Sequence, residues 1–328
     1  MKINIIGAGT WGTALGCLLE KKNSNHKITI WQRDSLKTDK IINSQTHPKL
    51  KNFKIPASIK FTSSLNELDF NELTIIAIPS STISNVLPKN LQNGDYVIAS
   101  KGFDLNTGLL CSEMLQSKFN LNSDNIAVLS GPNHAEEVIM GKASAAVIAS
   151  HNSRFSSSLQ ELFSSDVFRV YRSNDVLGVQ IGAAVKNVIA IASGLCVGLN
   201  LGDNAQAALV SRGMNEIMNL GRIYSIDERT LYGLSGLGDL IATCYSKYSR
   251  NRELGILIAE GYSLDEAKNK IGMISEGINT SQILNNISKD NNLDMPICTE
   301  VYKILFEGND PKKSLYELMT RSLKEENN

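Results

Sequence analysis

Residues 5–16 read IIGAGTWGTALG, and this stretch decides the fold of the first half of the chain. Gly7, Gly9 and Gly12 have the spacing GxGxxG, directly after an apolar run and directly before a helical pattern. In such a loop the first glycine allows a tight turn, the second lets a pyrophosphate approach the backbone, and the third lets helix and strand pack closely. The first N–H groups of the helix then face the anion. The stretch predicts a strand–turn–helix unit that binds a dinucleotide; the alternative is a glycine-rich turn without a ligand.

Apolar runs of strand length recur through the first half of the chain and alternate with helical patterns. Runs without polar alternation are typical of strands covered on both faces, and strands that alternate with helices favour a parallel sheet. We therefore predict a Rossmann-like, doubly wound α/β domain over residues 1–178. Its strands are expected at 3–7, 28–31, 74–79, 96–102, 127–132 and 145–150, with a last one at 168–171.

After about residue 178 the strand pattern stops, and the rest of the chain, 179–328, is predicted to be an all-helical substrate-binding and catalytic domain. No long linker separates the two parts, so we expect them to share a cleft. Proline and N-capping residues mark several helix starts. The expected helices cover 175–199, 203–225, 227–233, 250–260, 263–271, 276–291, 297–306 and 311–324.

The composition narrows the class of protein. The chain has 33 basic and 33 acidic residues, so it lacks the basic surplus of a nucleic-acid binder. Its five cysteines are far apart and its four histidines are scattered, which argues against a disulfide framework or a metal site and favours a reducing cytosol. The N-terminus could pass for a lipoprotein signal, but glycines break its apolar run. No stretch of 18 uninterrupted apolar residues predicts a membrane span.

The residues after the second predicted strand bear on the choice of cofactor. A site that prefers NAD usually has an acidic residue here for the ribose hydroxyls, whereas an arginine accommodates the phosphate of NADP. This chain has Gln32, Arg33 and Asp34. Arg33 is either a contact for that phosphate or a solvated surface residue, so NAD and NADP both stay open.

One lysine stands in the middle of a strongly apolar helical stretch. Residues 181–194 read IGAAVKNVIAIASG, and Lys186 is their single charged group. Ammonium groups are rarely buried without a partner. In one interpretation the lysine stem covers apolar surface while its head reaches water. In the other, Lys186 faces the cleft between the domains and serves acid–base chemistry.

Three further segments predict ligand contacts. Ser249 is a candidate N-cap, and the helix start with Arg250 beside it would suit a phosphate, although a capped surface helix fits equally. ASKGF (99–103) and SGPNHAEE (130–137) each follow a predicted strand. Loops at that end of a doubly wound sheet line the ligand crevice. Lys101 and the loop around Asn133 are therefore expected near the substrate and the nicotinamide.

Eight segments together resemble the bacterial NAD(P)-dependent glycerol-3-phosphate dehydrogenases. The resemblance runs from about residue 3 to residue 322, with the motifs in the family's order and near its spacing. It implies reduction of dihydroxyacetone phosphate to sn-glycerol 3-phosphate, a precursor of phospholipids, in the cytoplasm by a homodimer. The segments are GAGTWGTALG, SKGF, SGPNHAEEV, VQIGAAVKNVIAIASG, LGDNAQAALVSRGMNEI, GLGDL, TC…SRNRELG and EGINTSQ.

The resemblance also implies roles for single residues. Lys186 stands where the family has its general acid/base, and Asp239 is expected to orient or pair with an ammonium. Asn133 falls where members often have Ser or Thr, and Arg33 falls at a variable position. The implied substrate contacts are Lys101, Gly131, Asn133, Asp239, Ser249, Arg250 and Asn251; the implied cofactor contacts, besides the three glycines, are Thr10, Trp11, Arg33, Lys101, Ala135, Arg250, Ile274 and Glu276.

Three other functions are compatible with parts of the sequence. A hydroxyacid or ketopantoate-type dehydrogenase would share the architecture, but SRNRELG with GLGDL indicates a phosphate site that those families lack in this form. A non-catalytic dinucleotide sensor would need neither Lys186 nor Lys101. A membrane-bound flavin enzyme acting on the same metabolite is disfavoured by the nicotinamide-site pattern and the lack of a membrane segment.

Overall fold

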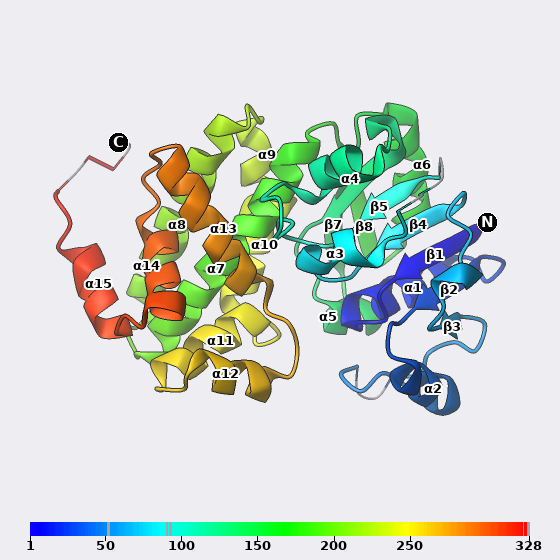
Figure 1. Ribbon diagram of the computed structural model, residues 1–328, viewed down its shortest axis with the longest axis horizontal. Helices are drawn as coiled ribbons and strands as arrows, with labels where there is room; N and C mark the ends of the chain where they lie inside the picture. The colour runs from blue at the N-terminus through cyan, green and yellow to red at the C-terminus, as the bar shows by residue number, and fades with distance from the viewer. Residues whose placement is uncertain (51–52, 90, 92–93, 324, 327–328) are drawn as a thin grey trace. The chain divides into compact units, whose positions relative to one another are not determined.

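The computed structural model describes residues 1–50, 53–89, 91, 94–323 and 325–326. Its first part contains one eight-stranded sheet with the strand order β3-β2-β1-β4-β5-β6-β7-β8 (Figure 1). The order reverses between β1 and β4, which is the point where doubly wound sheets bind their ligands. The strands are β1 (Lys2–Ile6), β2 (Lys27–Trp31), β3 (Lys60–Thr62), β4 (Leu73–Ile76), β5 (Tyr96–Ile98), β6 (Ile126–Ser130), β7 (Ser144–Ala149) and β8 (Phe168–Ser173).

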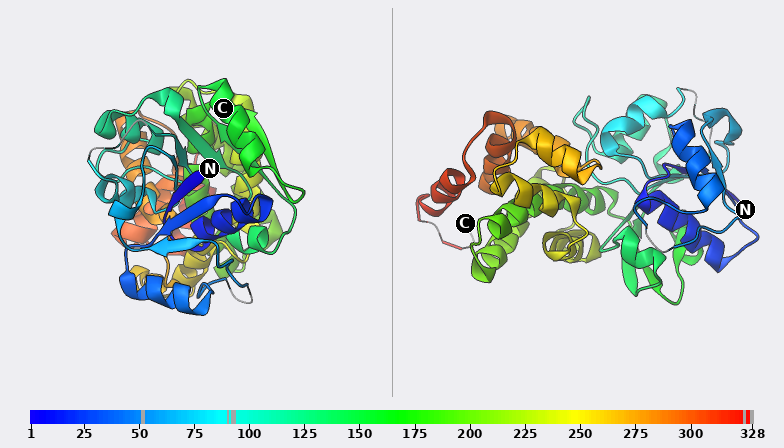
Figure 2. Two further views of the ribbon diagram at one scale, coloured as in Figure 1. Left: turned by 90° about the vertical axis from the view of Figure 1, so that its right-hand side faces the viewer. Right: turned by 90° about the horizontal axis from the view of Figure 1, so that it is seen from below.

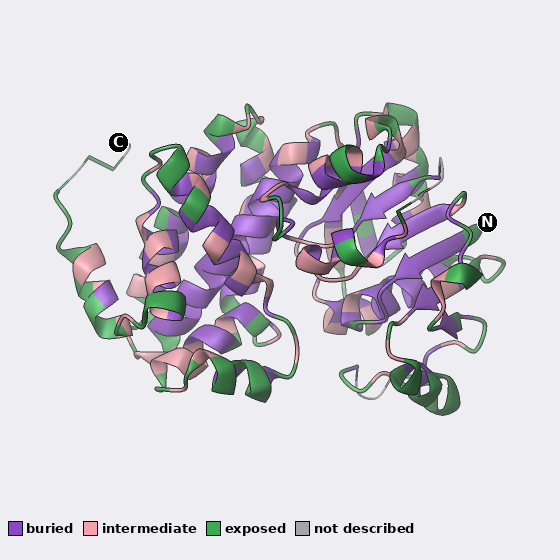
Figure 3. Ribbon diagram, viewed as in Figure 1, coloured by how far each residue is buried: buried purple, intermediate pink, exposed green. Residues whose placement is uncertain are grey.

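The central strands of this sheet are buried on both faces, as the apolar runs predicted, whereas buried and exposed residues alternate in the edge strand β8 (Figure 3). Successive residues of a strand point to opposite faces. In β1, Ile3 and Ile5 pack in one apolar cluster and Ile6 packs in the other. In β5, Val97 belongs to the first cluster, and both of its neighbours belong to the second. A sheet with two such cores needs helices on both sides.

Two groups of helices supply those covers, and Figure 2 shows the sheet between them. The first cluster takes side chains from α1 (Thr10–Lys22), α5 (Ala135–Ile139) and α6 (Ser153–Phe163). The second takes side chains from α3 (Ser80–Val86), α4 (Cys111–Phe119) and the start of α7 (Val176–Gly198). Helix α2 (Ser35–Ser44), which follows β2, adds Ile41 to the first cluster. The predicted Rossmann-like domain is confirmed.

Two details of the sheet differ from the prediction. β7 pairs antiparallel with β6 and parallel with β8, so the expectation of a wholly parallel sheet is wrong for its last two strands. An apolar run reports burial but not strand direction, which depends on how the connection before it folds. The three-residue strand β3 was missed, because it pairs only with β2 at the edge and has no continuous apolar run.

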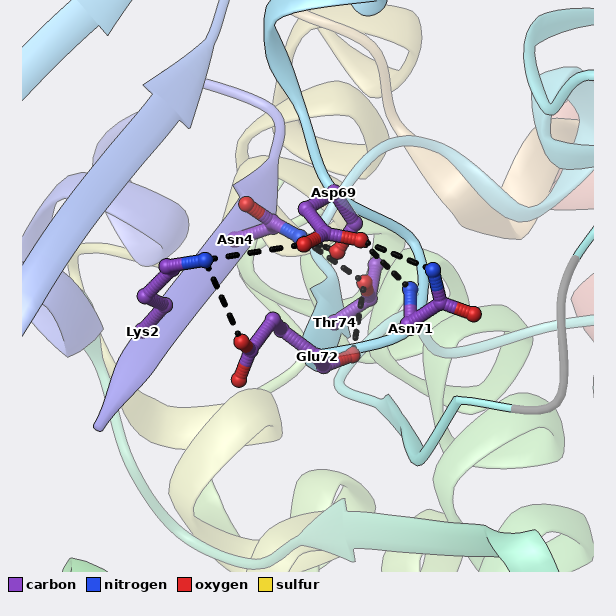
Figure 4. Close-up of polar contacts among 6 residues, drawn as sticks. All are labelled: Lys2, Asn4, Asp69, Asn71, Glu72 and Thr74. Atoms are coloured by element: carbon purple, nitrogen blue, oxygen red, sulfur yellow. Dashed lines mark hydrogen bonds and ion pairs between the residues drawn. The ribbon is translucent and has the colours of Figure 1, made fainter.

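A polar cluster joins β1 and β4 at the end of the sheet opposite the glycine loop (Figure 4). The buried Asn4 donates through Nδ2 to the carbonyl oxygen of Asp69 at 2.8 Å and to Oγ1 of Thr74, its register partner, at 3.4 Å. Lys2 forms ion pairs with Asp69 at 3.6 Å and Glu72 at 3.4 Å. A buried amide must find partners. These contacts therefore favour the pairing register that places the ends of β1 and β4 side by side.

The chain after β8 is helical, as predicted, and most predicted helices match within a few residues. The glycine-rich segment before Asp239, which by itself is typical of a turn, forms a π-helical turn followed by a short helix. The last predicted helix, 311–324, ends earlier, and residue 324 lies outside the described residues. The elements are α7, α8 (Asp203–Ile223), α9 (Glu228–Tyr232), the π turn Leu234–Gly238, α10 (Asp239–Tyr245), α11 (Arg250–Ala259), α12 (Leu264–Ile271), α13 (Glu276–Asp290), α14 (Pro296–Tyr302), the π turn Lys303–Glu307 and α15 (Pro311–Met319).

The chain divides into two compact units. The first joins Met1–Ala183 with Ile226–Asp239, and the second joins Ala184–Ser225 with Leu240–Asn328. Helix α7 runs through the first boundary without a break. The predicted division after residue 178 is a division by function, into a dinucleotide-binding and a substrate-binding part, and it stays a prediction.

Helix α7 also resembles a membrane span by length and composition. However, 89% of its most apolar window is buried inside the protein. Burial of this kind is typical of the core helix of a globular protein. Helix α7 is therefore a core helix of this protein.

A buried carboxylate in the second unit predicts a pH-dependent stability. Glu216 of α8 accepts hydrogen bonds from the backbone N–H groups of Ile297 at 2.6 Å and Cys298 at 3.0 Å, in the first turn of α14. Burial raises the pKa of this carboxyl to about 7 from its ordinary 4.5, against the hydrogen bonds, which lower it. The folded state therefore holds the proton more tightly than the unfolded state.

Because the pKa of Glu216 is higher in the folded state than in the unfolded state, the free energy of unfolding decreases as the pH rises. The contribution of Glu216 is fully present below pH 4.5 and is lost as the pH rises through about 7. At about 1.4 kcal/mol per pKa unit, the loss is up to about 3 kcal/mol of unfolding free energy. We expect Glu216→Gln to remove this dependence. Urea unfolding of both proteins at several pH values between 4.5 and 8 measures it, and parallel stability curves would contradict the prediction.

Candidate active site

The glycine loop has the steric features that its spacing predicted. Gly7, just after β1, has φ +118°, and a Cβ there would lie 2.7 Å from the carbonyl oxygen of Ala77. A Cβ on Gly12 would lie 1.9 Å from the carbonyl oxygen of Gly7. A Cβ on Gly9 would have no atom within 4 Å. Two glycines are thus required by packing, whereas Gly9 leaves open space beside the start of α1.

That helix start is available to an anion. Gly9 is the N-cap of α1 and supplies no side-chain cap, so the N–H groups of the first turn carry no hydrogen bond from it. Thr10 is the first helical residue and is buried. Trp11 packs against the core of the first unit, and its buried indole Nε1 has no hydrogen-bond partner among the described residues. The loop and the first turn of α1 together form an anion-binding cradle.

Of the two charged residues directly after β2, Asp34 is bound within α2 and Arg33 is exposed. Asp34 is the N-cap of α2 and accepts from the backbone N–H of Lys37 at 3.1 Å; the side chains also form an ion pair at 3.5 Å. These interactions, the backbone hydrogen bond first, lower the pKa of Asp34. Its carboxylate is therefore engaged within its own helix. Arg33 is exposed.

Lys101 is the centre of a polar cluster in the first unit. Its ammonium donates to the carbonyl oxygen of Gly131 at 3.1 Å, to Oδ1 of Asn133 at 3.1 Å and to Oδ2 of Asp239 at 2.9 Å. An ammonium has three protons, and these three acceptors match them. Asp239 is 2% exposed, so its charge needs this partner. The structure thus brings together four predicted residues, and Asp239 pairs with an ammonium as expected.

The same cluster orients Asn133. Because Oδ1 accepts from Lys101, the amide nitrogen Nδ2 points elsewhere, and this buried atom has no partner among the described residues. The assignment of oxygen and nitrogen follows from this hydrogen bond. Asn133 therefore offers donor hydrogens where a serine or threonine would offer a hydroxyl. Ala135, two residues later, is the buried first residue of α5.

Lys186 is buried in the second unit. Only 4% of the residue is exposed, which excludes a lysine whose head is solvated. Its Nζ donates to Oγ1 of Thr243, on α10, at 2.7 Å. Sequence reasoning missed Thr243, although it lies four residues after Asp239 and so on the same side of α10. The hydroxyl of Thr243 therefore fixes the direction of one N–H bond of this buried ammonium.

The start of α11 is capped by its own N-cap residue and is hydrogen-bonded to residues around the start of α13. Ser249 caps the helix by accepting from the N–H of Arg252 at 3.2 Å, as predicted. Arg250 donates to the carbonyl oxygen of Ile274 at 3.2 Å. Glu276 is the first residue of α13, and this helix start is also tied to α11, because its Gly277 donates to Asn251.

Asn251 connects three helices. Its Oδ1 accepts from the N–H of Gly277 on α13 at 3.0 Å, and its Nδ2 donates to Oδ1 of Asn187 on α7 at 3.0 Å. Asn187 follows Lys186 directly and was also missed by sequence reasoning; its position beside the lysine was the available signal. Since a Cβ on Gly277 would lie 2.7 Å from the backbone oxygen of Asn187, the helices approach closely here.

The predicted residues therefore fall into two sets, one in each compact unit. Within the described part of the chain, no group of three or more His, Cys, Asp or Glu could hold a metal ion. All five cysteines are buried, and none of them forms a disulfide. The first set contains Gly7, Gly9, Thr10, Trp11, Gly12, Arg33, Lys101, Gly131, Asn133, Ala135 and Asp239; the second contains Lys186, Ser249, Arg250, Asn251, Ile274 and Glu276.

Comparison with known proteins agrees with this geometry over the whole chain. Residues 2–156 match the family model described as the N-terminus of NAD-dependent glycerol-3-phosphate dehydrogenase, and residues 175–316 match the C-terminus. The chain is 41% identical to glycerol-3-phosphate dehydrogenase [NAD(P)+] of Thermoanaerobacter sp. (strain X514), covering 99% of each. A same-named protein of Fusobacterium nucleatum is also 41% identical, covering 99% of this chain and 98% of the relative. The crystal structure of glycerol-3-phosphate dehydrogenase from Coxiella burnetii superposes with a TM-score of 0.90 at 32% identity, covering 98% and 99% of the two chains.

A Rossmann-like sheet with this glycine loop, followed by a helical part with a buried lysine, defines an NAD(P)-dependent oxidoreductase acting on a CH–OH group. The chain belongs to the NAD-dependent glycerol-3-phosphate dehydrogenase family. This membership separates it from the hydroxyacid and ketopantoate-type dehydrogenases that share the architecture.

Proposed function

We propose that the protein catalyses the reversible, NAD(P)H-dependent reduction of dihydroxyacetone phosphate to sn-glycerol 3-phosphate, for phospholipid synthesis in the cytoplasm. The observation that carries the proposal is the buried Lys186 ammonium, bonded to Thr243, in a chain of this family. Residues 1–178 would bind the dinucleotide, and residues 179–328 would bind the substrate and carry the general acid/base. The active form is proposed to be a homodimer, which sedimentation of the purified protein would test.

The glycine loop fits a dinucleotide. The space beside Gly9 and the uncapped start of α1 suit a pyrophosphate. When bound, the cofactor supplies or accepts the hydride at nicotinamide C4. Further contacts are proposed for Thr10, Trp11, Arg33, Lys101, Ala135, Arg250, Ile274 and Glu276.

Lys186 is proposed to move the proton. In the direction of reduction it is protonated; it stabilises the developing alkoxide and donates a proton to the former carbonyl oxygen. In the reverse direction it removes the proton of the alcohol. Thr243 Oγ1 accepts one hydrogen of the ammonium and so limits its orientation. Proton transfer depends on such alignment.

The remaining residues are proposed to hold the substrate. The start of α11, with the positive end of its helix dipole and with Arg250 as its first residue, suits the phosphate. Asn251 supports this helix start through its two contacts. The unused Nδ2 hydrogens of Asn133 would donate to a substrate oxygen. Lys101, Gly131 and Asp239 complete the set of substrate contacts.

The loss of nicotinamide absorbance with dihydroxyacetone phosphate tests the reaction. Purified protein is mixed with the substrate and either NADH or NADPH, and rapid oxidation is expected with at least one. No oxidation with either cofactor, by protein shown to be folded, would overturn the proposal. Binding of the dinucleotide without turnover would instead favour the non-catalytic sensor.

Cofactor preference gives a prediction for Arg33. Since Asp34 is engaged as the cap of α2, the exposed guanidinium of Arg33 is proposed to contact the 2′-phosphate of NADP(H). Arg33→Ala is expected to lower kcat/KM for NADPH roughly 10- to 100-fold, from the loss of a charged hydrogen bond. The value for NADH should change less than about threefold, because NADH lacks that phosphate.

A matched control removes an exposed cation from α2, the helix that follows Arg33. Lys40→Ala changes the net charge equally but lies beyond the first turn of α2. It should leave the ratio of the two kcat/KM values unchanged. If Arg33→Ala also leaves that ratio unchanged, Arg33 is a surface residue without a role in cofactor choice.

A further inference from the structure

Helix α10 carries Thr243 but has little intrinsic stability. It has seven residues and follows a π turn that contains Gly236 and Gly238. A helix this short is not stable by itself in water. The last carbonyl groups of any helix also lack partners within it. Contacts from other elements must therefore hold α10 in place: Lys101 pairs with its first residue, Asp239, and side chains of the second unit contact its later residues.

Two of these contacts come from one face of α7. Lys186 donates to Oγ1 of Thr243 at 2.7 Å, and Ser193 donates through Oγ to the carbonyl oxygen of Cys244 at 2.9 Å. Lys186 and Ser193 are seven residues apart, which is about two helical turns, so they lie on the same face. Thr243 and Cys244, which are adjacent in α10, are thus held by two side chains on the same face of α7.

A third helix completes this arrangement. Gln206, near the start of α8, donates through Nε2 to Oγ of Ser193 at 2.7 Å and to the carbonyl oxygen of Cys244 at 3.3 Å. All of these residues are buried. The two hydrogens of the amide match two acceptors, the Ser193 hydroxyl and the last-turn carbonyl of α10. Gln206 therefore caps the end of α10 from outside and orients the serine that also caps it.

We propose that Gln206 is a positioning residue for Lys186. It acts on the lysine through Cys244 and the adjacent Thr243, whose hydroxyl accepts from the ammonium. Without the amide, the Cys244 carbonyl keeps Ser193 as a donor, but that hydroxyl is no longer held in place. The end of α10 can then shift, and the hydrogen bond that orients the ammonium is weakened. The proposal rests on the proposed role of Lys186 as general acid/base.

The first experiment is Gln206→Leu, which keeps the approximate size and removes both donor hydrogens. We expect kcat for dihydroxyacetone phosphate to fall on the order of tenfold, because proton transfer is sensitive to small displacements. The KM values for the substrate and the dinucleotide should change less than about twofold, since the variant alters no proposed binding contact.

The control is Glu216→Gln, which disturbs another buried polar contact of α8 in the same unit. It lies ten residues further along the helix, about 15 Å away. Both variants are expected to lower the melting temperature, but Glu216→Gln should keep kcat within about twofold of the original. If Gln206→Leu and Glu216→Gln lower kcat equally, Gln206 contributes only to the stability of the fold, and the proposal is overturned.

A double variant tests whether Gln206 acts on Lys186 through Thr243. Gln206→Leu is placed in a Thr243→Val background, where the hydroxyl that links α10 to Lys186 is absent. If Gln206 acts through Thr243, its substitution should lower kcat there by less than about twofold. A full tenfold loss in this background would overturn the proposal.

Folding of each variant is checked by circular dichroism. If Gln206→Leu does not fold, Ser193→Ala is used instead, because Ser193 is hydrogen-bonded to both Gln206 and Cys244. The Ser193→Ala variant should have a lower kcat and little change in KM. Normal kcat in Ser193→Ala would then overturn the proposal. The unmodified protein is assayed in parallel. If it has no activity, the proposed function is contradicted. If it is active and Gln206→Leu has the same kcat, only the positioning role is contradicted.

Discussion

Lys186→Ala is expected to lower kcat by a factor on the order of 10² to 10⁴, the usual contribution of general acid–base catalysis. The residue is buried on α7 and its ammonium is held by Thr243. Alanine leaves no group there to donate the proton or stabilise the alkoxide. Because the proposed phosphate contacts lie on α11, the substrate KM should change less than kcat. Steady-state kinetics with a saturating dinucleotide measure both values.

The comparison with Thr243→Val separates chemistry from orientation. That variant keeps the ammonium and removes the hydroxyl that accepts one of its hydrogens, so kcat should fall about tenfold, the value of one hydrogen bond to a charged group. Both proteins must keep their melting temperature within a few degrees for the comparison to hold. Near-normal turnover of Lys186→Ala would show that another group supplies the proton.

The second large effect is expected in the glycine loop. Gly12→Ala places a Cβ 1.9 Å from the carbonyl oxygen of Gly7, so α1 must move away from β1. Such overpacking of a core contact costs about 3 kcal/mol. In a chain of this size the melting temperature should fall by roughly 5–10 °C. Dinucleotide binding should be lost with it, because the loop and the first turn of α1 no longer keep their geometry.

Gly9→Ala is the matched control three positions earlier in the same motif. Its Cβ has no atom within 4 Å, and its φ of −71° is allowed for alanine. The melting temperature should therefore change by less than about 2 °C. The KM for the dinucleotide should still rise on the order of 100-fold, because the methyl group occupies the space proposed for the pyrophosphate.

The two variants together test whether the motif binds a ligand or only makes a turn. Thermal unfolding and titration with NADH and NADPH are measured for both. A stable Gly9→Ala variant with unchanged dinucleotide affinity would contradict the proposed cradle. A Gly12→Ala variant with unchanged melting temperature would show that α1 and β1 are less tightly packed than the structure indicates.

The sequence by itself determined the features that depend on neighbours along the chain. The spacing of Gly7, Gly9 and Gly12 predicts a tight turn because turn geometry is set by a few consecutive residues. The uninterrupted apolar runs predicted a sheet buried on both faces, and the two cores confirm it. Ser249 could be recognised as a helix cap for the same reason, since capping involves residues within one turn.

Only the tertiary structure decided the features that depend on distant residues. The 2.9 Å pair of Lys101 and Asp239 joins positions 138 residues apart, and the spacing between them carries no signal of the contact. The partner of Lys186 belongs to α10, a helix hidden in a sequence that reads as a glycine-rich turn. The direction of β7 likewise follows from the path of the chain before it. Local sequence sets which backbone conformations are favourable, whereas pairing across the fold is selected by the free energy of burying and bonding many side chains at once.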